Sequence, residues 1–251
     1  MPVSALLLSA SAAARVASLN LCTDEYLLLL AEPQQVVSVS YLSHDPLESP
    51  LWRTARKYTG NRGSIEDVIS LKPTMVLTMG GGGRATALIA SRLHIPVLDL
   101  PYATSLSDVE KSLKTIASAL GDLRRADPWI TRIEQLRRMA PVRAQDTILI
   151  SGHGDSLAPD SLGAQWLRLA GFQQRALPGG RATLETLLTN PPKVLIRSNY
   201  RSGEMSGGAR WLDHPIVRRA GAWQLVTDGR PWTCVGPLMI AEIERLRKAR
   251  R

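Results

Sequence analysis

The sequence predicts an α/β protein with two lobes, each a parallel sheet wrapped by helices, joined by a single long helix. The first observation is a repeat, because residues 64–77 and 183–196 match in residue type without a gap. Each copy has a hydroxyl residue suited to an N-cap, a glutamate in the first helical turn, a helix that stops near a proline, and a buried strand. Two such units in the same register, one in each half, indicate two similar lobes.

Alternating strand and helix patterns in the first half predict the N-terminal lobe, residues 15–122. This alternation is typical of a parallel sheet with helices on its faces. Strand patterns occur at residues 16–19, 36–39, 74–78 and 97–100, and helical patterns at residues 24–31, 65–71, 84–93 and 107–120.

An amphipathic helix between the halves is the expected connection, within residues 123–140. Asp127 and Pro128 make a good N-cap and N1 pair, and apolar side chains from Trp129 to Met139 recur at helical spacing. The alternation then resumes in the C-terminal lobe, residues 141–251. Its patterns are strands at 147–150 and 223–226 and helices at 163–170 and 237–249, around the second repeat copy.

The first fourteen residues resemble the end of a secretory signal. They form an apolar run rich in alanine, serine and leucine that stops just before Arg15. We therefore interpret residues 1–14 as a signal-peptide remnant. No later stretch approaches the roughly 18 apolar residues of a membrane span, so we expect a soluble mature protein.

The chain is basic, with a formal net charge of +9 from 31 Lys and Arg against 22 Asp and Glu. A positive balance favours nucleic acid, an anionic membrane surface or acidic small molecules as partners. The densest basic runs lie on predicted helices or at the C-terminus, without interleaved aromatic residues. This distribution is typical of solvated helix faces, and argues against a nucleic-acid partner.

Loops that follow strands are the expected binding site, because ligands of parallel α/β sheets bind at the carboxyl ends of the strands. These loops mix aromatic rings, imidazoles and arginine, which suits a large ligand that is partly flat and partly anionic. The candidate ligand-binding residues are Tyr41, His44, Tyr102, His153, Arg197, Tyr200 and Trp232.

Two alternatives to the binding of such a ligand stay open. His44 and His153 are the histidines that could serve a receptor for bare Zn or Mn ions, although three converging ligands would be needed. Cys22 with either histidine could form the thiol–imidazole pair of an enzyme. However, the G-x-S-x-G nucleophile motif is absent and no paired carboxylates stand out. We therefore predict no catalytic residues, no resident metal and no cofactor.

Four segments together resemble a known family. They are residues 15–25, residues 61–77, residues 161–163 with 169–171, and the closing Trp-Thr-Cys-Val-Gly-Pro at 232–237. The chain resembles the bilobal periplasmic solute-binding proteins, of the helical-backbone type, that serve ABC importers for iron chelates (siderophores, haem) and cobalamin.

The resemblance implies a non-enzymatic, monomeric protein of the periplasm. Such a protein captures a metal chelate between its lobes and delivers it to the membrane permease and its ATPase. In that family a surface glutamate on each lobe docks against arginines of the permease, and these positions correspond to Glu66 and Glu185 here. The resemblance does not fix the ligand. We favour a ferric siderophore or another anionic iron complex over cobalamin, because Arg62, Arg84, Arg197 and Arg201 are expected near the cleft.

The two cysteines, Cys22 and Cys234, lie near opposite ends of the chain, and neither belongs to a C-x-x-C pair. In an oxidising compartment a single long-range disulfide is plausible, and two free thiols are an equal alternative. Similar family members carry both cysteine motifs together, which makes a shared role attractive.

Overall fold

The computed structural model describes residues 14–80, 84–201, 203 and 206–250. Residues 1–13 of the expected signal segment therefore lie outside the described residues. Within the described ranges, no helix is both long and apolar enough to cross a lipid bilayer.

The first lobe is built on a five-stranded sheet in the order β3-β2-β1-β4-β5, with every pairing parallel. The four strands expected from the sequence are present. The sequence patterns missed β3, a short strand at the edge of the sheet. The strands are β1 (Val16–Ser18), β2 (Val36–Ser40), β3 (Thr59–Asn61), β4 (Met75–Met79) and β5 (Val97–Leu100).

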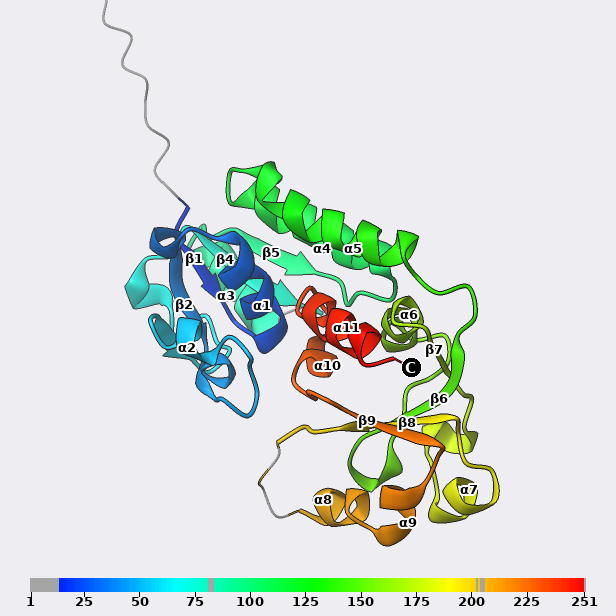
Figure 1. The fold of residues 1–251 in the computed structure, drawn as a ribbon. Helices are drawn as coiled ribbons and strands as arrows, with labels where there is room; N and C mark the ends of the chain where they lie inside the picture. Colours follow the sequence, from blue (N-terminus) through cyan, green and yellow to red (C-terminus); the bar gives the residue numbers. More distant parts are fainter. Residues whose placement is uncertain (1–13, 81–83, 202, 204–205, 251) are drawn as a thin grey trace, which may run out of the picture.

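The second lobe contains a four-stranded parallel sheet in the order β7-β6-β8-β9. Here the missed strand is again at an edge, β7. The strands are β6 (Gln145–Ile150), β7 (Phe172–Gln174), β8 (Val194–Ser198) and β9 (Trp223–Thr227). The two sheets and their surrounding helices form the two lobes expected from the sequence (Figure 1).

Helices surround both sheets, and several begin at residues whose side chains cap them. Asn20 accepts a hydrogen bond from the Thr23 amide at 2.9 Å at the start of α1, and Ser105 forms a capping box with Asp108 at the start of α4. The α-helices are α1 (Leu21–Leu30), α2 (Trp52–Ala55), α3 (Arg84–Arg92), α4 (Leu106–Ala119), α5 (Asp127–Arg138), α6 (Leu162–Leu169), α7 (Leu184–Thr189), α8 (Gly207–Leu212), α9 (Pro215–Arg219), α10 (Pro231–Cys234) and α11 (Met239–Lys248).

The two copies of the sequence repeat do not fold alike. The second copy is an α-helix, α7, capped by Thr183 and followed by β8. For the first copy, the prediction of an α-helix at 65–71 is wrong. This segment makes turns and then a 3₁₀-helix at Ile69–Leu71. The Asp67 carboxylate accepts a hydrogen bond from the Arg62 amide before the turn, and Lys72 adopts a left-handed conformation after it. Both features favour tight turns over a continuing helix.

The connection between the lobes is α5, whose first turn contains Pro128. It lies beside α4, which runs the opposite way across both lobes (Figure 1). Near the start of α4, Gln165 on α6 of the second lobe donates to the Thr104 carbonyl at 3.0 Å. Beyond its other end, Gln35 of the first lobe donates to the Leu120 carbonyl at 2.9 Å. Two antiparallel helices therefore brace the lobes.

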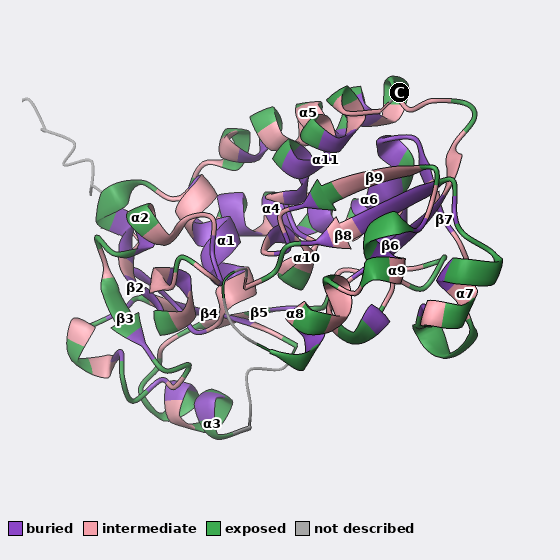
Figure 2. Ribbon diagram, turned by 60° about the horizontal axis from the view of Figure 1, so that its bottom comes forward, coloured by how far each residue is buried: buried purple, intermediate pink, exposed green. Residues whose placement is uncertain are grey.

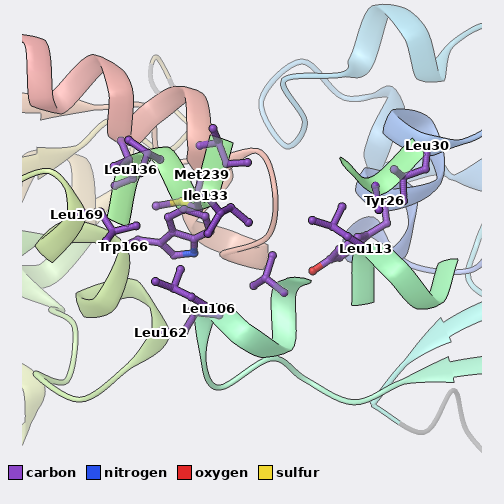
Figure 3. Packing of buried hydrophobic residues seen from close by; sticks show 14 of the residues in the cluster. Tyr26, Leu30, Leu106, Leu113, Ile133, Leu136, Leu162, Trp166, Leu169 and Met239 are labelled. Atoms are coloured by element: carbon purple, nitrogen blue, oxygen red, sulfur yellow. The ribbon is translucent and has the colours of Figure 1, made fainter. Parts of the chain in front are cut away.

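A single apolar core continues from one lobe to the other through these helices. Trp166 on α6 is fully buried and lies among Ile133, Met239 and Leu106, which come from three other helices (Figure 3). Its indole nitrogen donates to the Val235 carbonyl at 2.9 Å, so it also holds the end of α10. Large separation of the lobes would open this core, which favours a stiff scaffold.

The C-terminal segment is fastened to the first lobe by a disulfide and a buried carboxylate. Cys22 on α1 is bonded to Cys234 at the end of α10, with their Cα atoms 5.3 Å apart. Next to it, Glu25 is buried and accepts a hydrogen bond from the Leu238 amide. Gly236 leaves room for this contact, because a Cβ atom there would lie 2.8 Å from the Glu25 carboxylate.

The buried carboxylates of α1 predict a protein that loses stability as the pH rises. Burial raises the pKa of Asp24 to about 7 and that of Glu25 to about 8. Between pH ~4 and these values the folded chain binds more protons than the unfolded chain, so the free energy of unfolding falls as the pH rises over this range and levels off above about 8. Urea unfolding between pH 5 and 9 measures this slope.

Glu25→Gln keeps an acceptor for the Leu238 amide and removes the titrating group, so we expect a flatter dependence of stability on pH. Glu134→Gln, at an exposed position on α5, controls for the substitution itself. Equal slopes for the wild-type protein and Glu25→Gln would contradict this prediction.

Candidate functional site

A cavity of about 490 Å³ lies at the carboxyl ends of the second lobe's strands. This volume is within the range of small-molecule sites. Its walls are the segment after β6, the end of β8 with the residues that follow it, and α8. Three of the residues predicted from the sequence line it: His153, Arg197 and Tyr200.

Arg197 brings a positive charge to this cavity, whose lining also includes Asp155 and Asp213. Among the described residues it forms no ion pair, and its hydrogen bond to the Leu212 carbonyl is long, at 3.5 Å. Its Nε atom is buried and has no hydrogen-bond partner. A buried donor of this kind is normally satisfied, so the site is suited to an anionic acceptor.

His153 is held at the cavity wall by close packing against α8. It lies in a left-handed conformation, with φ of 62°, within the 3₁₀ turn Gly152–Gly154. A Cβ atom on Gly207 would lie 3.0 Å from its imidazole Cε1 atom, and one on Gly208 would lie 3.0 Å from the Gly152 Cα atom. The two glycines therefore let α8 approach this turn closely and fix the ring.

Tyr200 reaches across to the first lobe. Its hydroxyl donates to the Glu48 carboxylate, with an oxygen–oxygen distance of 2.5 Å. Burial raises the pKa of Tyr200, and the Glu48 carboxylate raises it further. The next residue, Arg201, also pairs with Glu48 and lies 3.9 Å from the Asp45 carboxylate.

The first lobe presents two exposed tyrosines at the carboxyl ends of its strands. Tyr41 follows β2 and is 57% exposed, and Tyr102 follows β5 and is 69% exposed. Asp24 holds the turn that carries Tyr41, because its buried carboxylate accepts hydrogen bonds from the Ser40 amide and the Ser43 hydroxyl. Because the strands of this sheet are parallel, both rings follow the same edge of it; β2 and β5 are labelled in Figure 2.

The position of the Tyr102 ring also explains why residue 80 is a glycine. Its ring lies so close to Gly80 that a Cβ atom there would be 2.2 Å from the ring edge. Gly80 has a φ of 74°, a conformation that other residues rarely adopt. The end of β4 thus supports the Tyr102 ring from behind.

The structure does not bring His44 and Trp232 into the cavity. The His44 ring packs against Gly60 of β3, inside the first lobe, and its Nε2 atom is buried without a partner. The Trp232 indole donates to the Thr227 hydroxyl at 2.8 Å and packs against the core. Across the described residues, no group of three or more His, Cys, Asp or Glu side chains is placed to hold a metal ion.

Glu66 and Glu185 are both exposed, one on each lobe. Glu185 lies in the first turn of α7. Glu66 lies in the turn that precedes the 3₁₀-helix, so the expectation that an α-helix carries it is wrong. No ion pair joins either carboxylate to another described residue.

Comparison with protein families identifies the chain. Residues 16–173 match the family model for the periplasmic binding protein family. The chain belongs to the periplasmic binding protein family. It is therefore a binding protein by family and by fold. No curated protein sequence matches it.

Solved structures of periplasmic binding proteins share this fold. The haem binding protein HutB of Vibrio cholerae has a TM-score of 0.73 at 20% identity, over 94% of this chain and 98% of that one. A periplasmic haem binding protein from Pseudomonas aeruginosa has a TM-score of 0.70 at 21% identity, over 94% and 91%. The vitamin B12 binding protein BtuF of Vibrio cholerae has a TM-score of 0.62 at 17% identity, over 93% and 97%.

Sequence reasoning missed Glu48 and the glycines that support the site. Glu48 lies in a loop with no motif, and its side-chain partners are more than 150 positions away in the chain. Gly207 and Gly208 follow a hydroxyl residue as a plain helix start would. The adjacent pair of glycines was the one available signal of a close backbone approach.

Proposed function

We propose that this periplasmic binding protein is the substrate-binding component of an ABC importer, and that it captures an iron chelate between its lobes and delivers it to a membrane permease. Haem is the ligand that the cavity favours. The main support for haem is that Arg197, Tyr200 and His153 line one cavity. A phenol and an imidazole are suitable axial ligands for haem iron, and an arginine suits its carboxylates.

The solved structures of similar fold support this choice, since several are described as haem binding proteins. In the proposed site, Tyr41 and Tyr102 provide aromatic surface from the first lobe, and Arg197 provides a positive charge in the second. The docking residues are Glu66 and Glu185. Since a binding protein that hands over its ligand needs no catalytic group, each of these residues acts by binding alone.

Titration of the purified protein with ferric haem tests the proposal through the Soret absorption band. We expect saturable binding to one site. Arg197→Gln is expected to weaken it by about 10- to 150-fold, the equivalent of a charge-assisted hydrogen bond of about 1.5–3 kcal/mol. Tyr200→Phe is expected to change the Soret position as well, because it removes an oxygen that can bind iron.

Two variants serve as matched controls. Arg92→Gln removes an exposed arginine at the end of α3, and Tyr58→Phe removes a hydroxyl from a tyrosine packed against the first lobe's core. Neither is expected to change haem binding. Binding of cyanocobalamin or a ferric siderophore in place of haem, unaffected by Tyr200→Phe, would contradict the assignment.

A further inference from the structure

Glu48 is a buried carboxylate whose side-chain partners come from the opposite lobe. It lies in the loop after β2, and its side chain is 10% exposed. One carboxylate oxygen accepts a hydrogen bond from the Tyr200 hydroxyl at 2.5 Å, and the other pairs with the Arg201 guanidinium. A carboxylate buried this deeply needs hydrogen-bonding or charged partners to offset its lost hydration. Here both side-chain partners belong to the other lobe.

The partners of Glu48 are residues of the ligand cavity. Tyr200 and Arg201 both line it, directly after β8. In Figure 1 the loop after β2 extends toward the segment that follows β8. The contact therefore joins the wall of the proposed site to the other lobe.

The backbone around Tyr200 has little freedom apart from this contact. A Cβ atom on Gly229 would lie 2.4 Å from the Tyr200 Cβ atom, so the backbone of the 228–230 turn presses on Tyr200 from behind. Arg201 has a φ of 49°, a left-handed conformation that costs energy for a residue with a side chain. A residue in such a conformation is retained when the surrounding structure holds it in place. The ion pair with Glu48 contributes to holding Arg201.

Further polar contacts flank the Glu48 pair. Asp45 lies 3.9 Å from the Arg201 guanidinium, and Arg230 donates to the Pro46 carbonyl at 2.8 Å. The loop 45–48 thus contacts the second lobe at Asp45 and Pro46 as well as at Glu48.

We propose that Glu48 is a positioning residue of the ligand site, which holds the Tyr200 phenol and the Arg201 guanidinium in place from across the cleft. It acts through these two side chains and not on the ligand. The proposal rests on the proposed function for the identity of the site, but the fixation of Tyr200 by Glu48 is a property of the protein without ligand.

The first test therefore needs no ligand. In protein labelled with carbon-13 at the Cζ atom of tyrosine, the resonance absent from Tyr200→Phe identifies Tyr200. Glu48→Gln has the same shape and lacks the charge, so we expect it to move this resonance. Glu110→Gln is the matched control, because Glu110 is a partly buried carboxylate paired with Arg137, away from the cleft. We expect it to leave the Tyr200 resonance in place.

The second test measures affinity for ferric haem. Glu48→Gln is expected to weaken binding at least 10-fold, and Glu110→Gln is expected to leave it within 2-fold of the wild-type protein. If Glu48 acts through its two partners, adding Glu48→Gln to a Tyr200→Phe/Arg201→Gln background will weaken binding less than 2-fold further. Circular dichroism checks that each variant is folded.

The outcomes separate the two proposals. An unmoved Tyr200 resonance in Glu48→Gln overturns the positioning role, as does an equal loss of affinity with and without the two partners. Absence of haem binding by the wild-type protein overturns the proposed ligand instead. In that case the resonance experiment alone decides the role of Glu48.

Discussion

Replacing both Glu66 and Glu185 by lysine will abolish ligand uptake while the purified protein still binds its ligand. Each carboxylate is exposed, lies on a separate lobe and has no ion pair to another described residue, so each is available to a basic partner surface. In the proposed docking, each lysine would face an arginine of the permease, and an attraction would become a repulsion of several kcal/mol at each end. Because neither residue lines the cavity, ligand affinity should stay unchanged.

Uptake of labelled ligand by cells that contain the cognate permease measures the effect, with affinity measured in parallel. Glu134→Lys/Asp160→Lys is the matched control, since it makes the same change in net charge at two other exposed carboxylates. Each single reversal should reduce uptake in part, because the opposite lobe still docks. If the double variant lost ligand affinity but still stimulated the permease, the docking assignment would be wrong.

The sequence was informative about the sheets because their central strands are buried and apolar. Such strands alternate with amphipathic helices in a pattern that is visible without neighbours. The missed strands, Thr59–Asn61 and Phe172–Gln174, are edge strands of only three residues, and each contains a single apolar side chain or none. Pairing with an adjacent strand, and not their own composition, makes them strands.

The sequence repeat shows that segments with matching residue types can fold differently. Its two copies have matching residue types, yet one is an α-helix and the other is a turn with a 3₁₀-helix. In the first copy the Asp67 side chain accepts the Arg62 amide, whereas the second copy has Thr186 at the equivalent position. Local side-chain-to-backbone contacts of this kind compete with helix formation, and residue types alone do not reveal which wins.

For the site, the position of the loops was predictable and the direction of the side chains was not. Parallel strands place their following loops together, and Arg197 and Tyr200 line one cavity there. Trp232 also follows a strand, but its indole donates a hydrogen bond to the Thr227 hydroxyl and does not line the cavity. Glu48 depends on a contact between lobes that exists only in the folded chain.

Removing the bond between Cys22 and Cys234 is expected to lower the free energy of unfolding by about 2–5 kcal/mol. The cysteines are 212 positions apart, so the bond restricts the unfolded chain over most of its length. Urea unfolding of Cys22→Ser/Cys234→Ser, with and without a reductant, measures the effect. The wild-type protein should become as unstable as the variant when it is reduced, and the variant should not respond.

The bond is also expected to support the ligand site. Arg230, at the start of α10, donates to the Pro46 carbonyl in the loop that carries Glu48, and the disulfide fastens the end of α10 to α1. Without it, α10 depends on the Trp166 hydrogen bond to Val235 and on Glu25 for its place. We therefore expect the serine variant to bind ferric haem more weakly than the wild-type protein even at low temperature, where both are folded. Addition of two alkyl groups to the denatured, unreduced protein would show free thiols instead, and neither the stability loss nor the affinity loss should then occur.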